Sequence, residues 1–96
     1  MEYTFEWNPS KATSNLLKHN VSFEEAATIF KDSRNISIYD TAHSREEDRW
    51  ITIGLSETGK FLVVCHTFKE IDKKRTSIRI FSTRKATKPE IKQYQK

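Results

Sequence analysis

The 96-residue sequence contains one cysteine, two glycines and two prolines, and it has no long hydrophobic run. The single cysteine, Cys65, cannot form an internal disulfide, which fits a reducing compartment and argues against a disulfide-stabilised secreted fold. No segment approaches the roughly 20 apolar residues that a membrane-spanning helix needs, and no signal peptide is recognisable. Two glycines are too few for a glycine-rich phosphate-binding loop. We therefore expect a cytoplasmic protein that does not bind membranes and is not a nucleotide-binding enzyme.

The composition and the distribution of charge narrow the class further. A hydrophobic content of 35% in 96 residues is enough for one modest core, so we expect a single domain over residues 1–96. The formal net charge is +4, but residues 69–96 carry ten Lys and Arg against three Asp and Glu, which leaves about −3 for the first 68 residues. This asymmetry favours a polyanionic partner, either RNA or an acidic protein. The alternative is an ordinary lysine-rich surface in contact with water.

Capping residues predict three helices. Asn8 followed by proline predicts a helix over residues 9–19, because asparagine caps the exposed N–H groups and proline is tolerated in the first turn. A capping box that begins at Ser22 predicts a second helix extending to about residue 31. Another capping box, at Thr87, predicts a short C-terminal helix. Two N-terminal helices and one C-terminal helix should therefore flank the strands.

Alternating β-branched and aromatic residues predict five strands. The first covers residues 3–7, and the others cover residues 35–39, 49–55, 61–68 and 75–81. The short break around Gly59 predicts an antiparallel hairpin between the third and fourth strands. The expected order is β-α-α-β-β-β-β-α, which is an α+β fold with helices packed on a sheet.

Side-chain alternation predicts which residues share a face of this sheet. In the last strand the two isoleucines belong to the core, so Arg79 should point away from it. The same alternation puts Ile51, Ile53 and Leu55 on the core side and leaves Trp50 and Tyr39 on the face away from the core. His66 joins them if Val63 and Cys65 face the helices. This face would combine aromatic planes for base stacking, a guanidinium for phosphate and an imidazole that titrates near neutral pH.

These residue types also supply the parts of metal-independent RNA cleavage. Such cleavage needs a base for the 2′-hydroxyl, cations around the crowded phosphorus and an acid for the leaving oxygen. His66 would act as base or acid, and Arg79 and Arg84 as permanently charged clamps. Two alternatives stay open, in which His66 is a half-buried structural histidine and Trp50 a packing residue. The candidates for RNA binding are Lys11, Trp50, Lys73, Lys74, Arg75 and Lys85.

A metal site is not expected from the sequence. The three histidines and Cys65 lack the close spacing of zinc ligands, and Cys65 and His66 would point to opposite faces of one strand. We therefore predict no metal and no cofactor.

Several short motifs occur along the chain in a fixed order and at natural spacing. They are F-E-W-N-P-S-K at 5–11, Asn15, K-H-N-V-S-F-E-E-A at 18–26, E-E-D-R at 46–49, I-G at 53–54, R-I-F-S-T-R-K-A at 79–86, Glu90 and Tyr94. Together they resemble the BrnT family of type II toxins over nearly the whole chain. The departures from the family pattern are mild, because Asn8 for aspartate still caps a helix and Asn20 for glycine tolerates a left-handed turn. Phe81 and Thr83 stand where the family has isoleucine and alanine.

The resemblance implies more than the residues alone do. It implies a RelE-like fold, in which an antiparallel sheet packs against helices, and a ribonuclease-type inhibition of translation. It implies a BrnA-type antitoxin as partner, RNA as substrate, including ribosome-associated mRNA, and DNA contact only through the antitoxin complex. Arg79 and Arg84 fall on family motif positions, and so do Lys11, Glu47 and Arg49 without an assigned role. A simple pairing of Glu47 with Arg49 across the sheet is the alternative to a functional role for these two residues. The alternative from another class is a degenerate toxin, a module that binds RNA or antitoxin and cuts nothing.

Overall fold

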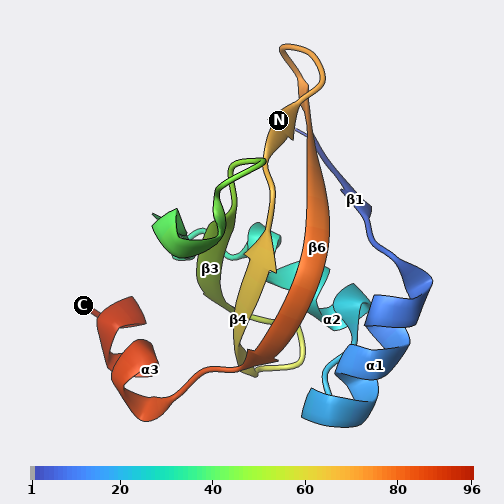
Figure 1. The fold of residues 1–96 in the computed structure, drawn as a ribbon. Helices are drawn as coiled ribbons and strands as arrows, with labels where there is room; N and C mark the ends of the chain where they lie inside the picture. The colour runs from blue at the N-terminus through green and yellow to red at the C-terminus, as the bar shows by residue number, and fades with distance from the viewer. Residues whose placement is uncertain (1) are drawn as a thin grey trace.

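The computed structural model describes residues 2–96, which form a twisted sheet flanked by helices (Figure 1). The elements are β1 (Glu2–Glu6), α1 (Pro9–His19), α2 (Phe23–Ala27), the 3-10 turn η1 (Thr28–Lys31), β2 (Ile36–Tyr39), the 3-10 turn η2 (Thr41–His43), β3 (Trp50–Leu55), β4 (Phe61–His66), β5 (Lys69–Glu70), β6 (Arg75–Lys85) and α3 (Lys88–Tyr94). Figure 1 shows α1 and α3 on opposite flanks of the sheet. The predicted α+β class and the order of the main elements are confirmed.

The strands lie side by side in the order β1-β6-β4-β3-β2, and the short β5 pairs with β6. Neighbours along β2, β3, β4 and β6 are antiparallel, as predicted, whereas β1 runs parallel to β6 and makes the sheet mixed. A parallel pair needs a long connection between its strands. Here the connection is the whole of the chain between β1 and β6. No local pattern in the sequence predicts that two strands so far apart will pair.

The predicted caps at Asn8 and Thr87 are present, whereas the capping box at Ser22 forms only in part. The Ser22 hydroxyl accepts from the Glu25 N–H, but the Glu25 carboxylate accepts from the hydroxyls of Ser56 and Thr58. The Asn8 side chain accepts hydrogen bonds from the backbone N–H groups of Ser10 and Lys11, and Asn20 ends α1 in the left-handed conformation with φ 57°. The capping box that starts at Thr87 opens α3. The second helix is shorter than predicted, because after Ala27 the chain tightens into η1.

The core lies between the α2–η1 layer and one face of the sheet. Its fully buried members from the helical layer include Phe23 and Ile29, and those from the sheet include Leu62, Val64, Ile78 and Ile80. Gly54 permits the closest approach of the two layers, since a Cβ atom there would lie 2.9 Å from Cβ of Ile29. The contact fixes which face of β3 meets the helices.

This contact corrects the predicted faces of β3 and β4. The prediction placed Ile51, Ile53 and Leu55 toward the core, but the face of β3 that meets the helices carries Gly54 and the buried Thr52. Likewise Leu62, Val64 and His66 of β4 face the core instead of Val63 and Cys65. Both faces carry apolar residues, because α3 also covers part of the sheet through contacts such as Phe61 with Tyr94. Alternation alone therefore cannot choose the core face.

A β-bulge interrupts the pairing of β4 with β6. His66 pairs with Ile80, but the next residue back, Cys65, pairs with Ser82, so that Phe81 has no partner on β4. A bulge bends its strand and redirects side chains locally. Phe81 is consequently available for contacts with side chains outside the core.

Candidate functional site

Three separate segments enclose a cleft of about 320 Å³ beside β6. Asn8 and Lys11 come from the start of α1, Glu47 and Arg49 from the segment before β3, and residues 79–81 from β6. We call it the Arg79 cleft. Its volume lies at the lower end of the range for ligand sites in proteins.

Cations surround an aromatic ring in the Arg79 cleft. The guanidinium carbons of Arg49 and Arg79 lie 4.1 and 4.8 Å from the centre of the Phe81 ring, and Lys11 Nζ lies 5.5 Å from it. All three distances fall within the range of cation–π attraction, which holds each cation over the ring. Three like charges so close together create a local positive potential that attracts an anion.

One carboxylate compensates this charge in part. Glu47 Oε1 accepts a hydrogen bond from Arg79 Nη2 and lies 3.9 Å from Arg49 Nη2. The pairing of Glu47 with Arg49 that the sequence suggested is thus the longer of the two contacts. Within residues 2–96, Arg49 Nε is buried without a hydrogen-bond partner. A buried N–H group without an acceptor is costly, and this cost falls on the guanidinium that stacks on Phe81.

Asn15 holds α1 against β6, so that the start of this helix forms one wall of the Arg79 cleft. Its buried side-chain amide donates to the carbonyls of Val21 and Thr83 and accepts from the N–H of Thr83. The two bonds with Thr83 join residues 68 positions apart and bring the start of α1 alongside Phe81. The sequence marked Asn15 only as a motif position, because a lone asparagine in a helix does not reveal its partner.

The structure places His66 inside the protein, on the opposite face of the sheet from Arg79. Its side chain is fully buried, with ring contacts to Phe30 and Phe68 at centroid distances of 4.8 and 4.6 Å. Nδ1 donates to the carbonyl of Thr67, and Nε2 accepts from the hydroxyl of Thr52 at 2.6 Å. Burial lowers the pKa of His66 to about 4, although the bond to the Thr67 carbonyl opposes this shift. The prediction that His66 shares a face with Arg79 is wrong.

Trp50 and Tyr39 also lie on the face of His66. The Trp50 ring packs edge to face between Tyr39 and Phe68, at centroid distances of 5.3 and 5.9 Å. Trp50 is half-buried in this aromatic cluster. The predicted constellation is therefore divided, with its aromatic rings and imidazole on one face and Arg79 on the other.

Arg84 lies on the same strand as Arg79 but is engaged elsewhere. Its guanidinium forms two parallel hydrogen bonds with the Glu90 carboxylate, at 2.8 and 2.9 Å, which tie β6 to the start of α3. This pairing, against a smaller effect of burial, lowers the pKa of Glu90 to about 2, and it raises the pKa of Arg84. Arg84 does not line the Arg79 cleft. Its contacts are those of a residue that anchors a helix.

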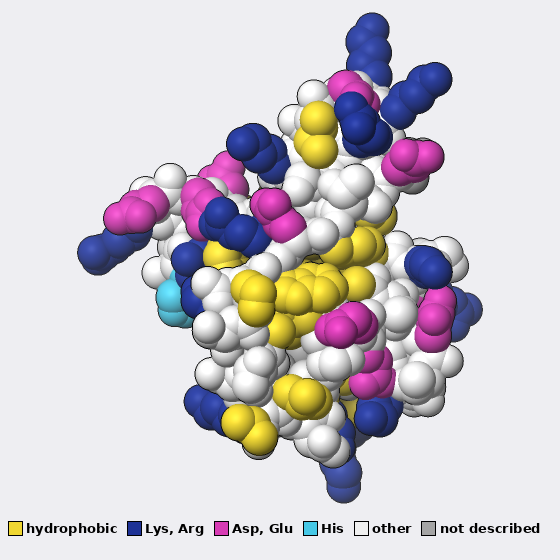
Figure 2. Space-filling model, turned by 90° about the vertical axis from the view of Figure 1, so that its right-hand side faces the viewer, with side chains coloured by type: hydrophobic (Ala, Val, Ile, Leu, Met, Phe, Trp, Pro, Cys, Tyr) yellow, Lys and Arg dark blue, Asp and Glu magenta, His cyan; other side chains and the backbone are white. Residues whose placement is uncertain are grey.

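The other predicted RNA-binding residues are spread over the surface. Lys73 and Lys74 lie in the turn between β5 and β6, where Lys and Arg side chains project beyond the body of the protein (Figure 2), and Arg75 there is paired with Asp72 at 2.8 Å. Lys85 ends β6 and is exposed. Of the six predicted positions, only Lys11 lines the Arg79 cleft.

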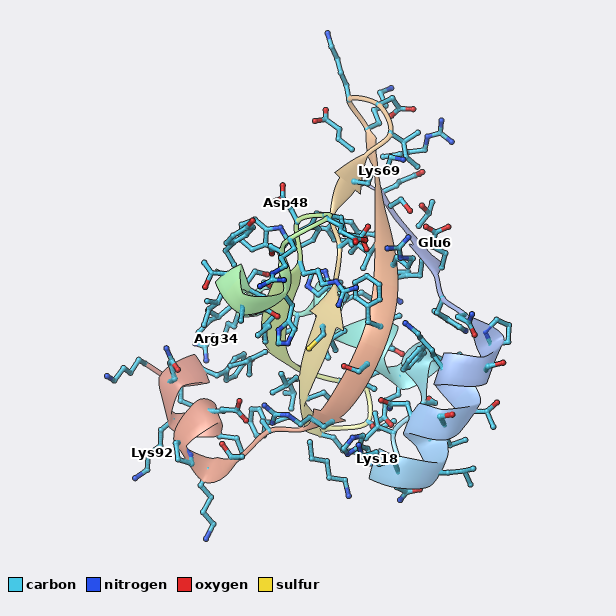
Figure 3. All side chains as sticks on the ribbon, in the orientation of Figure 1. Glu6, Lys18, Arg34, Asp48, Lys69 and Lys92 are labelled. Carbon is cyan, nitrogen blue, oxygen red and sulfur yellow. The ribbon has the colours of Figure 1, made fainter. Side chains whose placement is uncertain are left out.

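A further hollow of about 350 Å³ adjoins the Arg79 cleft. It shares Glu47 and Arg79 with the cleft and is bordered by Glu6, Asp48 and Lys69, which Figure 3 labels around the upper part of the sheet. Its mixture of acidic and basic side chains gives no strong charge of one sign. Among residues 2–96, no three His, Cys, Asp or Glu side chains converge to hold a metal ion. None of the helices in this part of the chain is long and apolar enough to cross a membrane.

Comparison with known proteins identifies the family. The sequence profile of a family described as the ribonuclease toxin BrnT of type II toxin-antitoxin systems matches residues 7–90. The chain belongs to the BrnT family. The family is that of the ribonuclease toxins of type II toxin-antitoxin systems, and a toxin of this type implies an antitoxin as its protein partner.

The fold agrees with that assignment. The crystal structure of the ribonuclease toxin BrnT of Brucella abortus superposes with a TM-score of 0.62, at 19% sequence identity, and covers 92% of this chain and 100% of that one. No curated protein sequence matches the chain. At this level of identity the superposition establishes the shared BrnT fold, and the residues that act must be argued from the site itself.

Proposed function

We propose that this chain is a metal-independent endoribonuclease that inhibits translation and that its active site is the Arg79 cleft. The observation that supports this most is the group of Arg49, Arg79 and Lys11 around Phe81, with one carboxylate between the arginines. This group combines positive charge for a phosphodiester with a group that accepts a proton.

The proposed reaction is attack of a ribose 2′-oxygen on the adjacent phosphorus. When a phosphate binds Arg79, the Glu47 carboxylate is released from that guanidinium and takes the proton of the 2′-hydroxyl. The new O–P bond forms as the bond to the 5′-oxygen breaks, and the Lys11 ammonium gives the leaving oxygen its proton. The products are a 2′,3′-cyclic phosphate and a 5′-hydroxyl. Arg79 and Arg49 stabilise the additional negative charge at phosphorus.

In this proposal the two other predicted catalytic residues have structural roles. The His66 ring is buried behind the sheet, and Arg84 is bound to Glu90. His66 supports the aromatic core, and Arg84 fixes the start of α3.

The proposed partners follow from the family and from the surface charge. A BrnA-type antitoxin would neutralise the toxin by covering the Arg79 cleft, and contact with DNA would occur only through that complex. Ribosome-associated mRNA is the proposed substrate in the cell. The net charge of +4 favours binding of RNA and of an acidic antitoxin segment.

One observation favours the second candidate, a degenerate toxin that binds RNA or antitoxin without cutting. No histidine lines the Arg79 cleft, so catalysis there depends on a carboxylate and an amine in place of an imidazole. If that pair is ineffective, only the binding of anions remains.

Induced expression in bacteria separates the two candidates. The wild-type chain should arrest growth and produce new internal RNA ends, while Arg79→Ala should do neither and remain folded. Lys92→Ala is the matched control, because Lys92 is an exposed cation on α3 away from the cleft, and it should remain toxic. Soluble, folded wild-type protein that causes no arrest would favour the binding module.

A further inference from the structure

The Arg79 cleft continues along α1 into a second hollow of about 350 Å³. This hollow is distinct from the one bordered by Glu6, Asp48 and Lys69. The two share Lys11 and Phe81, so the Phe81 ring lies at their junction. The second hollow is bordered farther along by Lys18 and His19, at the end of α1. Figure 3 shows Lys18 at that end of the helix, beside the lower end of β6. A continuous surface thus runs from Arg79 past Phe81 to the end of α1.

Two cations on this surface, Lys11 and Lys18, have no acidic partner among residues 2–96, although Lys11 also lies over the Phe81 ring. Lys11 and Lys18 are seven residues apart, which is two helical turns or about 10 Å along one side of α1. Neither forms an ion pair with an acidic side chain in the part of the chain that the structure describes, and α1 has no acidic residue in its first turn. Their charge is therefore available to an external anion that extends along the helix.

The Phe81 ring gives this surface an aromatic plane between its cations. The ring is half-buried and lies at the β-bulge, outside the core. Proteins that bind single-stranded nucleic acids combine a positively charged groove with aromatic rings on which unpaired bases stack. A base inside a duplex is stacked between its neighbours and cannot reach such a ring without being flipped out.

We propose that the groove formed by Lys11, Lys18, Arg49, Arg79 and Phe81 binds single-stranded RNA. An unpaired base takes the place of the Lys11 ammonium, the most distant of the three cations on the Phe81 ring, and stacks there. One flanking phosphate lies at Arg79 and Arg49, and the strand continues along α1 past Lys11 toward Lys18. This inference rests on the proposed function, since it assigns the substrate of the same cleft. It makes Phe81 the residue that selects unpaired RNA.

A binding experiment with an uncleavable probe tests the inference independently of catalysis. The probe is a 2′-O-methyl RNA octamer with one 2-aminopurine, compared with the same strand in a duplex. Wild-type protein should bind the single strand at least tenfold more tightly and quench the 2-aminopurine by stacking. Phe81→Leu should bind about tenfold more weakly without quenching, whereas Phe81→Trp should retain both. Equal affinity for strand and duplex, without quenching, would overturn the inference, and wild-type protein alone decides this if Phe81→Leu does not fold.

The salt dependence of the same binding tests the path along α1. Removal of one phosphate contact lowers the slope of log K against log salt by about 0.7 for a single strand. Lys18→Ala should show this loss, and Lys92→Ala on α3 should keep the wild-type slope. Equal slopes for all three proteins would overturn the path along α1. If the probe binds as described and unmodified RNA is not cut, the proposed endoribonuclease fails while the single-strand groove stands.

Discussion

The burial of His66 makes a specific prediction about stability and pH. Its pKa is lowered from 6.5 to about 4 because the imidazole is buried, so the folded protein holds His66 neutral at pH values where the unfolded chain protonates it. Unfolding therefore takes up a proton between about pH 6.5 and 4, and the stabilisation present above pH 6.5 is lost as the pH falls toward 4. At 1.36 kcal/mol for each pKa unit, the loss is about 3 kcal/mol. That is a large fraction of the stability of a small domain.

The comparison with His66→Gln isolates this effect. Glutamine does not titrate, and its amide can bond to Thr52 and to the Thr67 carbonyl in place of the imidazole. The variant loses ring contacts with Phe30 and Phe68, so it should be less stable at pH 7. Urea unfolding at intervals from pH 7.5 to pH 4 should show the two free energies converging by about 3 kcal/mol. Carboxylates that titrate in this range contribute equally to both proteins and cancel in the difference.

Parallel free-energy curves for the two proteins would contradict the burial of His66. A second readout addresses catalysis, because the folded His66→Gln protein should cut RNA within about twofold of the wild-type rate at pH 7.5. A loss of cleavage of a hundredfold or more in folded protein, as is common when a general acid or base is removed, would place the imidazole in the reaction after all.

Three other substitutions test contacts that position the cleft and its surroundings. Asn15→Leu should lower the free energy of unfolding by about 3 kcal/mol in urea, because it leaves three buried backbone groups of Val21 and Thr83 without partners. Gly54→Ala should lower the melting temperature, because the new methyl group would meet Ile29 at 2.9 Å, and an unchanged value would refute this contact. Glu90→Gln should cost about 1 kcal/mol above pH 4.5 and progressively less toward pH 2, because the pKa of Glu90 is lowered and the exposed part of its pair with Arg84 is screened.

Local sequence signals predicted the secondary structure well. Helix caps are read from single side chains, and the start of α1 after Asn8 and of α3 after Thr87 agree with the prediction. The strand β5 and the continuation of β6 to Lys85 were not predicted, because a two-residue strand and a run of Ser, Thr and Arg carry little hydrophobic alternation.

The candidate site was predicted only in part, for a physical reason. Alternation assigns residues to two faces but does not say which face the helices cover, and β4 is apolar on both sides. His66 was therefore predicted to lie on the same face as Arg79. In the structure, Ile29 packs on Gly54, so the helices cover the face of the sheet that carries His66. Glu47 enters the cleft from the segment before β3, and Phe81 enters it at the β-bulge of β6. A single sequence gives no reliable signal for either position.

The most direct test of the Arg79 cleft as an active site is cleavage of a defined single-stranded RNA by purified protein in the presence of EDTA. The wild-type chain should produce fragments that end in a 2′,3′-cyclic phosphate. Arg79→Ala and Glu47→Gln should each lower the rate by about a hundredfold or more, while Lys92→Ala leaves it unchanged. Cleavage at the wild-type rate by folded Arg79→Ala protein would contradict the central claim and place the active site elsewhere on the molecule.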